Sequence, residues 1–453
     1  MANSGDDSQS RPTLNDPHFE GFPEAPEIFS WIEEIVGFGV RRPGYEGDFN
    51  CQEWIKNKFN EFGLVEVKGE EVPLNIWQEN GASLKVYLLD NPSIFVDVPA
   101  YPLPFSKPVE NFQAPLRHLE STDFPNGDFV ALDKVQLSEV PLQFFRSLAT
   151  SYFDPENEFD SLVQTLPFGQ RFTEVLAPAM NIGAKGFIGV LDGFPWLTKE
   201  YYVPYDGIIR DIPAIWVDKE AGSKITELMG RGEVIASISV KGRNYSGSSQ
   251  NIVASLKGKE DKWIIIGSHH DAPWASAVED GTGIAMVLAQ AKYWSKTAER
   301  KYNMMFLLTA GHMSGGAGTR KFIETHNELL KDTVIEIHLE HAANECRGEN
   351  GNLIATGEPE CRWWFTSEIE ELQKSVASAI SAENLKRSLI LKPDIFMEHP
   401  PTDGGFFHLA GVPILDFLTA PMYLFDKLDT LDKVDVNGLL PISRAVVRVI
   451  EDL

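Results

Sequence analysis

The fold is inferred from one stretch, Trp263-Ile264-Ile265-Ile266-Gly267-Ser268-His269-His270-Asp271, in which an apolar run of strand length ends abruptly in three polar residues. Buried parallel strands read as continuous apolar runs, and α/β proteins carry functional residues at the carboxyl ends of such strands. The stretch therefore predicts a central strand of a parallel sheet, with a site where that strand ends.

Two further apolar runs end in the same way. Residues 304–310 lead into His312, and residues 333–339 lead into Glu340 and His341. Parallel strands that end at the same edge of a sheet bring such side chains together. Imidazole and carboxylate are ligands of zinc, iron and manganese. The pattern thus predicts a metal-capable site that is shared by three strand ends.

A glycine-rich turn, Glu279-Asp280-Gly281-Thr282-Gly283, follows the first strand. Together with Asn251-Ile252-Val253-Ala254 and the run that ends at Asp271, this turn resembles the co-catalytic zinc aminopeptidase, or glutamate carboxypeptidase II-like, family. The resemblance implies an α/β fold: a three-layer core around a mixed, mostly parallel sheet.

The resemblance also assigns site residues, one position at a time. His269 stands at the family's first metal-binding histidine, and Asp271 stands at the carboxylate that orients the site. Glu279 falls on the metal-bridging aspartate, with Asp280 directly after it, and Glu340 falls on the next ligand aspartate. Both of these ligands are one methylene longer than in the family pattern.

Other positions depart from the family pattern. The Glu-Glu pair of the family reads as His312 and Met313 in the register set by Gly318, or as Gly311 and His312 if the loop has a one-residue gap. His312 therefore replaces either the general base or a ligand. Phe425 occupies the position of the family's last histidine. Because Met313 and Phe425 belong to one of the two metal positions, the resemblance implies that one metal is lost and one is kept.

We therefore predict one divalent metal, held by His269, Glu279 and Glu340, with Asp271 as a catalytic support. Zinc is the first choice, and iron or manganese suits the same ligands. His312 is the predicted catalytic acid or base, since an unperturbed histidine pKa near ~6.5 lies in the working range.

Further residues are candidates for the pocket around this metal. His341 follows Glu340 on a strand and so faces the other way, unless the strand end lets both side chains reach the site. Histidines on apolar faces are otherwise commonly structural, which is how we interpret His326, His338 and His408. The additional pocket candidates are His270, Asp280, His341, His399, Asp403 and Tyr423.

These residues indicate a metal-dependent hydrolase related to aminopeptidases. A lost second metal removes the usual clamp on a free amino terminus, so the expected substrate is a small amide or carbonyl compound or a short peptide. Two alternatives stay open. One is a lyase or cyclase that acts on a carbonyl substrate, with His312 moving the proton. The other is a catalytically inactive binding homologue.

The middle of the chain differs in character, because it is rich in proline and aromatic residues from about residue 93. The segments 181–190 and 212–217 resemble parts of the protease-associated domain that is often inserted in this family. The glycine- and serine-rich stretch 242–249 is predicted to be the linker back to the core. The predicted division is a loose segment 1–22, an aminopeptidase-like core 23–92 and 246–453, and an insert 93–245.

Composition narrows the range of partners. The chain has 453 residues and a formal net charge of −26, which argues against nucleic acid because no basic cluster would neutralise phosphates. Neither a signal peptide nor an apolar span for a membrane is visible. Three cysteines without metal-site spacing fit a reducing compartment, so we expect a cytoplasmic protein. A homo-oligomer remains open.

Overall fold

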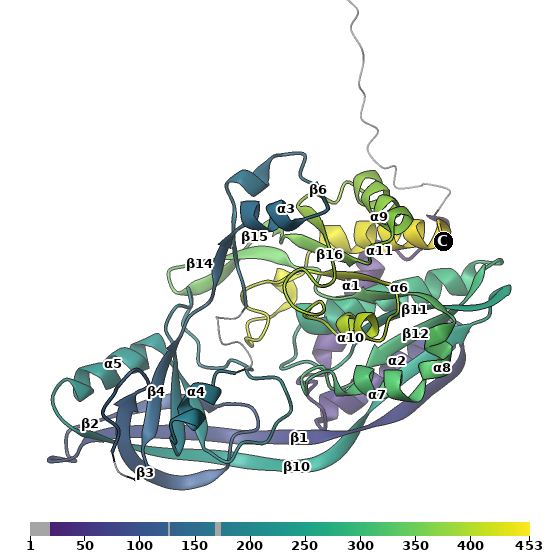
Figure 1. Ribbon diagram of the computed structural model, residues 1–453. Coiled ribbons are helices and arrows are strands. Elements are labelled where there is room, and N and C mark those ends of the chain that lie inside the picture. Colours follow the sequence, from purple (N-terminus) through teal and green to yellow (C-terminus); the bar gives the residue numbers. More distant parts are fainter. Residues whose placement is uncertain (1–18, 126, 168–173) are drawn as a thin grey trace, which may run out of the picture.

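The computed structural model describes residues 19–125, 127–167 and 174–453 of the chain. Within these ranges the protein is a mixed α/β fold built on a 14-stranded sheet (Figure 1). The first 18 residues of the predicted loose segment 1–22 lie outside the described residues. No helix in the described ranges combines the length and apolar character needed to cross a bilayer.

Four parallel strands form the centre of the sheet. Their order is β12 (Tyr302–Thr309), β11 (Glu260–His269), β13 (Thr333–Leu339) and β18 (Ile414–Leu418). The first three are the apolar runs that predicted strands, and this prediction is confirmed. Since they run in the same direction, their carboxyl ends lie at one edge of the sheet.

Helices cover both faces of this centre, as the three-layer prediction requires. Ile264 and Ile266 are buried in one core, whereas Ile265 between them is buried in another. Alternation along the strand thus feeds two separate cores. The first core includes α1 (Ala25–Gly37), α2 (Glu46–Glu61), α6 (Gly283–Lys296), α9 (Glu370–Ala382) and α11 (Val436–Glu451), and the second includes α7 (Ala317–Thr325) and α10 (Gly404–Leu409).

Two long antiparallel strands connect the centre to the rest of the sheet. β1 (Val65–Leu88) and β10 (Val234–Leu256) lie side by side along the molecule (Figure 1). The prediction of a linker at 242–249 is wrong, because this stretch is part of β10. Its residues face the backbone of β1, with Tyr245 opposite Ile76, and a strand with such a partner continues through glycine and serine.

The far halves of β1 and β10 continue into a second part of the sheet. There, β3 (Val109–His118), β4 (Val130–Val135), β8 (Gly186–Leu191) and β9 (Ala214–Asp218) run parallel, and β2 (Phe95–Pro102) joins β9 to β1. The expected strands within 181–190 and 212–217 are therefore present, as β8 and β9. The helix α5 (Lys219–Met229) follows β9 directly.

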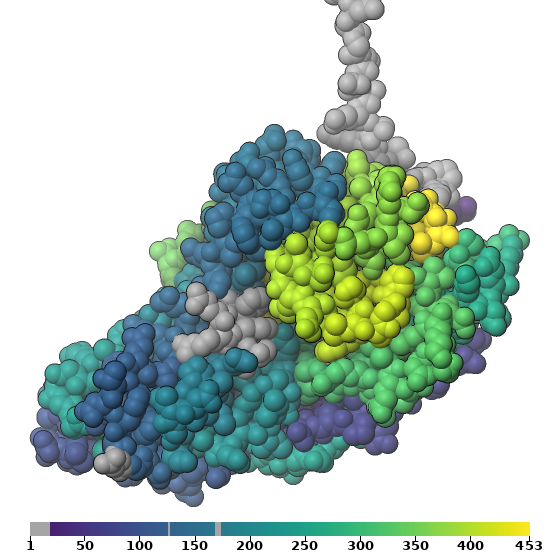
Figure 2. Space-filling view, viewed as in Figure 1, coloured from purple at the N-terminus to yellow at the C-terminus, as the bar shows by residue number. Residues whose placement is uncertain are grey.

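One part of the range 93–245 lies away from this second part of the sheet. The segment β5 (Glu139–Pro141), α3 (Leu142–Leu148) and β6 (Ser151–Phe153) reaches the core, where β6 pairs with β17 (Ser388–Leu391). In the space-filling view this dark-blue segment lies beside the yellow-green one that contains α10 (Figure 2). The Phe145 and Phe396 rings, 5.6 Å apart, are part of this contact.

A buried carboxyl group joins the same segment to the core. Gln164, in β7 (Val163–Thr165), donates from its amide to Glu360 and to the Ala420 carbonyl, the latter at 3.0 Å. Burial raises the pKa of Glu360 from 4.5 to about 8, and the charge of Glu345 adds to this effect. Glu360 is therefore protonated at neutral pH in the folded protein.

This shift predicts a pH-dependent stability. Because the pKa of Glu360 is higher in the folded than in the unfolded chain, the folded state binds its proton more tightly. The resulting stabilisation is complete below the unfolded pKa and is lost as the pH rises towards about 8. Each pH unit in this window changes the free energy of unfolding by at most ~1.4 kcal/mol. We expect Glu360→Gln to flatten this decline, so that its melting temperature exceeds that of wild type increasingly from pH 5 to 9. Equal slopes in thermal melts would contradict the assignment.

Candidate metal centre

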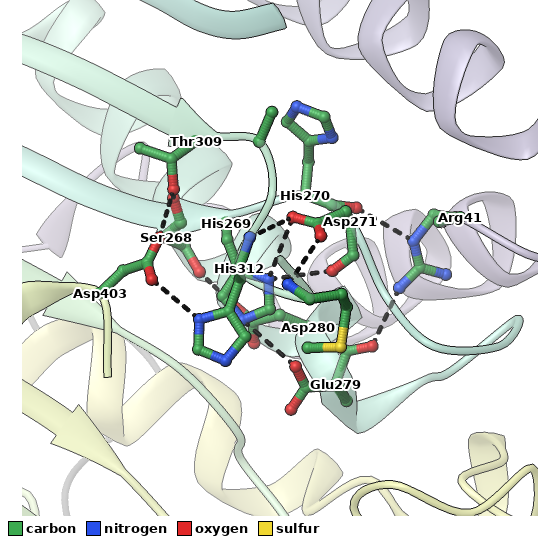
Figure 3. A network of polar contacts seen from close by, with 12 residues as sticks. Arg41, Ser268, His269, His270, Asp271, Glu279, Asp280, Thr309, His312 and Asp403 are labelled. Carbon is green, nitrogen blue, oxygen red and sulfur yellow. Dashed lines mark hydrogen bonds and ion pairs between the residues drawn. The ribbon is translucent and has the colours of Figure 1, made fainter. Parts of the chain in front are cut away.

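The three predicted strand ends meet at one place. His269 is the last residue of β11, Glu340 and His341 follow β13, and Glu279 comes from the turn before α6. All four side chains are buried, with exposed fractions of 0 to 3%. Figure 3 shows His269 and Glu279 close together with His312, which follows β12. Strand ends from three separate segments therefore form a single enclosed polar cluster.

Imidazole and carboxylate atoms converge within this cluster. His269 Nε2 lies 3.3 Å from Glu279 Oε1 and 3.8 Å from Glu340 Oε1. His341 Nε2 lies 2.6 Å from Glu279 Oε2 and 3.5 Å from Glu340 Oε2. The predicted ligands His269, Glu279 and Glu340 are thus brought together, and His341 joins them.

Several of these atoms are buried without a hydrogen bond of normal geometry. Among the described residues they include His269 Nε2, both carboxylate oxygens of Glu279, Glu340 Oε2 and His341 Nε2. Unsatisfied buried polar atoms are costly, and natural proteins contain few of them. Two groups of three ligand atoms share His269: one is completed by Glu279 and His312, the other by Glu340 and His341, and the atoms within each group lie within 4.8 Å of one another. Imidazole and carboxylate at such spacing suit a divalent cation. The donor set therefore fits the predicted metal.

The backbone explains why His341 faces the same way as Glu340. Successive residues of a strand point to opposite faces, but His341 has a φ of 42°, outside the strand region. Its Nδ1 lies 3.0 Å from the Thr419 carbonyl oxygen, so Nδ1–H donates there and Nε2 faces the carboxylates. His269 is held alike, with Nδ1 2.9 Å from the Asp271 carbonyl oxygen.

The charges of the cluster suit cation binding. Burial lowers the pKa of His269 well below 6.5, which keeps its Nε2 lone pair free. Burial opposes ionisation of Glu340, but the hydrogen bond from His338 lowers its pKa below the usual value. Burial would lower the pKa of His341, yet the Glu279 carboxylate raises it to about 10. A cation would replace the His341 proton, because histidine binds metals as neutral imidazole.

Two distant residues hold the turn that carries Glu279. Asp429 accepts from the backbone N–H groups of Val278 and Glu279, both at 2.8 Å. Arg41 donates through Nη2 to the carbonyl oxygen of Ser276 at 2.9 Å. It also donates to the carbonyl oxygen of Glu279 at 3.2 Å (Figure 3). The sequence prediction missed both residues. Only Asp429 had a signal in the sequence, because it lies four residues after Phe425, which stands at the position of the family's last histidine.

Asp280 connects the same turn to the strand ends. It accepts from the N–H groups of Gly283 at 3.1 Å and His341 at 3.3 Å, and Ser268 donates its hydroxyl to the other oxygen. Gly283 is required here, because a Cβ would lie 2.1 Å from Asp280 Oδ2 and 2.3 Å from the Leu339 carbonyl oxygen. Asp280 thus supports the cluster by fixing its backbone.

His312 and Asp403 form a second buried pair beside the cluster. His312 Nδ1 lies 2.9 Å from Asp403 Oδ1, and the Thr309 hydroxyl donates to Oδ2 at 2.8 Å (Figure 3). The Thr319 hydroxyl donates to the same Oδ2 at 2.6 Å. Burial would lower the pKa of His312, but the Asp403 carboxylate raises it to about 10. Burial would raise the pKa of Asp403, but the charge of His312 lowers it to about 2. The pair therefore fixes the orientation of the His312 ring, with Nδ1–H directed at Asp403.

Four rings form a column that begins at His269. The His269 and His312 rings are 4.0 Å apart and almost parallel, and Tyr205 stacks on His312 at 5.5 Å. Phe425 stacks on the far side of Tyr205 at 5.0 Å. Phe425, which stands at the position of the family's last histidine, is thus part of the column. Met313, the other residue that departs from the family pattern, is fully buried. The space beside the cluster is consequently filled by rings.

The other predicted residues have different surroundings. Asp271 accepts from the N–H groups of His312 at 3.1 Å and Met313 at 3.0 Å, so it shapes the loop after β12. His270 Nε2 is 2.8 Å from the Gln250 carbonyl oxygen, and its Nδ1 faces Asp48 at 3.3 Å. The described contacts of His270 are therefore outside the cluster.

His399 and Tyr423 likewise make their contacts elsewhere. The His399 and Phe406 rings are 5.4 Å apart and tilted by 36°, and the Tyr423 hydroxyl lies 3.4 and 3.3 Å from the carbonyl oxygens of Asn344 and Lys433. In contrast, His338, interpreted from sequence as merely structural, contacts Glu340 at 2.9 Å. Its signal was the spacing of two residues, which places both on the same face of a strand.

Comparison with known proteins agrees with this geometry. The segment 251–450 matches the model of Peptidase family M28. This M28-matching segment contains all four residues of the cluster and the His312–Asp403 pair. No curated protein sequence matches the chain.

Solved structures resemble the chain over nearly its whole length. An aminopeptidase from Aneurinibacillus sp. strain AM-1 has 17% identity and a TM-score of 0.65, covering 95% of this chain and 94% of that one. A peptidase M28 precursor from Shewanella amazonensis SB2B has 18% identity and a TM-score of 0.69, covering 93% and 92%. BSAP, a zinc aminopeptidase from Bacillus subtilis, has 15% identity and a TM-score of 0.64, covering 95% of both chains. These likenesses establish the aminopeptidase-like fold.

Proposed function

We propose that this protein is a metal-dependent hydrolase of the aminopeptidase type with a single divalent metal. His269, Glu279, Glu340 and His341 hold the ion. The observation that carries the proposal is the convergence of their buried ligand atoms, which lack normal hydrogen bonds within the described residues. The match of residues 251–450 to Peptidase family M28 supports hydrolysis of an amide bond.

Zinc is the proposed metal, and iron or manganese is the alternative. Two imidazoles with carboxylates are common zinc ligands, and the similar protein from Bacillus subtilis is described as a zinc aminopeptidase. When bound, such a metal polarises a carbonyl group or lowers the pKa of bound water. The ring column of His312, Tyr205 and Phe425 supports a single ion, because it fills the space beside the cluster.

The remaining site residues have distinct roles in this proposal. His312 is the acid or base, with its Nδ1 bound to Asp403 and its Nε2 left for the substrate. Asp403 orients the ring and stabilises its charge. Asp271 holds the backbone of the His312 loop through two hydrogen bonds. Together the three residues place one proton donor beside the metal ligands.

The proposed substrate is a short peptide or a small amide or carbonyl compound. The chain around Tyr205 comes from the inserted part, for which we propose a protease-associated-like role as one wall of the site. We also propose a cytoplasmic location, which accords with three cysteines that are buried and unpaired. The proposed substrate depends on a cluster that holds its metal.

Metal analysis by plasma mass spectrometry tests the proposal directly. The purified protein is expected to contain about one zinc, iron or manganese per chain, and to hydrolyse a member of a panel of short peptides and amides. Two ions per chain would contradict the single-metal site. No stoichiometric metal after reconstitution would contradict the hydrolase itself and favour an inactive binding protein.

A lyase or cyclase is a second candidate, and one observation favours it. The Asp403 carboxylate, working against burial, raises the pKa of His312 to about 10, which makes this residue a better proton donor than a base. A donor beside a metal-bound carbonyl suits elimination or ring closure. Turnover in ¹⁸O-labelled water distinguishes the reactions, because hydrolysis transfers the label to the product and a lyase leaves the product unlabelled.

A further inference from the structure

A row of buried polar side chains continues from the metal cluster into the sheet. Glu336, His338 and Glu340 occupy alternate positions of β13 and its end, so they lie on one face. His338 Nδ1 is 3.0 Å from Glu336 Oε1, and His338 Nε2 is 2.9 Å from Glu340 Oε1. All three side chains have exposed fractions of 0 to 1%. The row ends at an atom of a proposed metal ligand.

The hydrogen bonds fix which atoms of Glu340 remain free. Each nitrogen of His338 faces a carboxylate oxygen, and a carboxylate accepts only, so both ring nitrogens donate. Oε1 of Glu340 is thereby engaged. Oε2 has no hydrogen bond of normal geometry within the described residues, and it faces His341 Nε2 at 3.5 Å. Oε2 is therefore the oxygen of this ligand that is left without a hydrogen bond, whereas Oε1, which lies 3.8 Å from His269 Nε2, is already bonded to His338.

Packing prevents the His338 ring from moving away. A Cβ at Gly404, the first residue of α10, would lie 2.8 Å from the Cβ of His338. On the neighbouring strand Asp416 is opposite His338, and Thr402 donates its hydroxyl to that carboxylate. The side chain of Glu336 has similarly little room, since a Cβ at Gly267 would lie 3.2 Å from Glu336 Oε1. The ring and its partner are thus held on both sides.

We propose that His338 and Glu336 are positioning residues that restrict Glu340 to single-oxygen coordination and so determine the affinity of the site for its metal. This inference rests on the proposed function, because it requires the cluster to bind a metal. Partners that orient ligands in this way typically contribute 10- to 100-fold to metal affinity or activity. A role in core stability alone predicts no such contribution.

The burial cost favours a positioning role over simple core packing. Two carboxylates and a histidine in the interior lose their hydration, and apolar residues of similar volume often stabilise a core equally well. A polar row is therefore useful when one end must be held in a defined orientation. Here that end is Glu340.

The test compares Glu336→Gln and His338→Leu with Glu360→Gln, which removes a buried carboxyl group outside the row. Glu336→Gln is the milder variant, because the new amide keeps an acceptor for His338 and removes only the charge. The zinc affinity of each full-length protein is measured by competition with a chelator. Visible spectra of the cobalt-substituted proteins report the coordination of the metal.

We expect zinc affinity to fall about 10- to 100-fold in Glu336→Gln, with one ion still bound, an altered cobalt spectrum and no change in Glu360→Gln. His338→Leu should show a larger loss of zinc affinity. If His338→Leu does not fold, the result for Glu336→Gln alone tests the positioning role. Unchanged affinity and spectrum, with only a lower melting temperature, would overturn the positioning role alone. A wild-type protein that binds no metal would overturn this inference together with the proposed function.

Discussion

His269→Ala is expected to lose the bound metal and to reduce turnover about 1,000-fold. A catalytic metal contributes several kcal/mol to transition-state stabilisation, and ~4 kcal/mol corresponds to about three powers of ten. His269 provides the Nε2 that faces both Glu279 and Glu340, at 3.3 and 3.8 Å, so no neighbouring side chain replaces it. Metal content by plasma mass spectrometry and initial rates measure the two effects.

His270→Ala is the matched control for this experiment. The residue is adjacent in sequence and equally buried, but its side chain contacts Asp48 and the Gln250 carbonyl oxygen. We expect this variant to keep one metal per chain, although the loss of these contacts lowers its melting temperature. Retention of one ion in His269→Ala, with wild-type affinity, would exclude the assigned ligand set.

The second large effect is expected for His312→Gln. A positioned acid or base contributes about 100- to 10,000-fold to the rate, so turnover should fall by this factor while the metal content stays at one per chain. His312 stacks on His269 at 4.0 Å and one of its ring nitrogens lies within 4.8 Å of a Glu279 oxygen, but its Nδ1 binds Asp403, which is outside the proposed ligand set. Steady-state kinetics and metal analysis on the same preparation separate the two roles.

Asp403→Asn serves as the companion variant. Asparagine can still bind the His312 ring but removes the charge that, against the effect of burial, raises the pKa of that residue to about 10. We expect a smaller loss of rate and an altered pH profile of kcat, since the proton on His312 is then held less tightly. Loss of the metal in His312→Gln would instead identify His312 as a ligand, and wild-type turnover would exclude it from catalysis.

The sequence predicted the central part of the site because local pattern was sufficient there. The run that ends at His269 and the run before Glu340 are apolar along most of their lengths, which is characteristic of buried parallel strands. Strands of this kind end at a common edge, so the histidine and the carboxylates were expected to meet. Their order along the chain, with Glu279 between them, supplied the rest of the prediction.

Alternation along the strand correctly predicted that Glu340 faces the site, but it did not reveal the contacts that His338 and His341 make there. His338 and Glu340 share a face, yet His338 was interpreted as structural because nothing in the sequence tells whether a strand partner leaves room for its ring. His341 was expected on the opposite face unless the strand end let both side chains reach the site, and its φ of 42° turns it towards Glu279. The linker prediction at 242–249 failed because β1 pairs with this stretch.

Local pattern thus determined the central strands, and the resemblance of the motif order to a known family assigned three residues of the cluster, because hydrophobic periodicity and motif order act over short distances along the chain. Only the tertiary structure revealed Tyr205 in the ring column, Arg41 and Asp429 at the Glu279 turn, and His341 among the ligands. Contacts of this kind join segments far apart in the sequence, or depend on one backbone angle. Both are set by packing of the whole chain, which no short stretch of residues encodes.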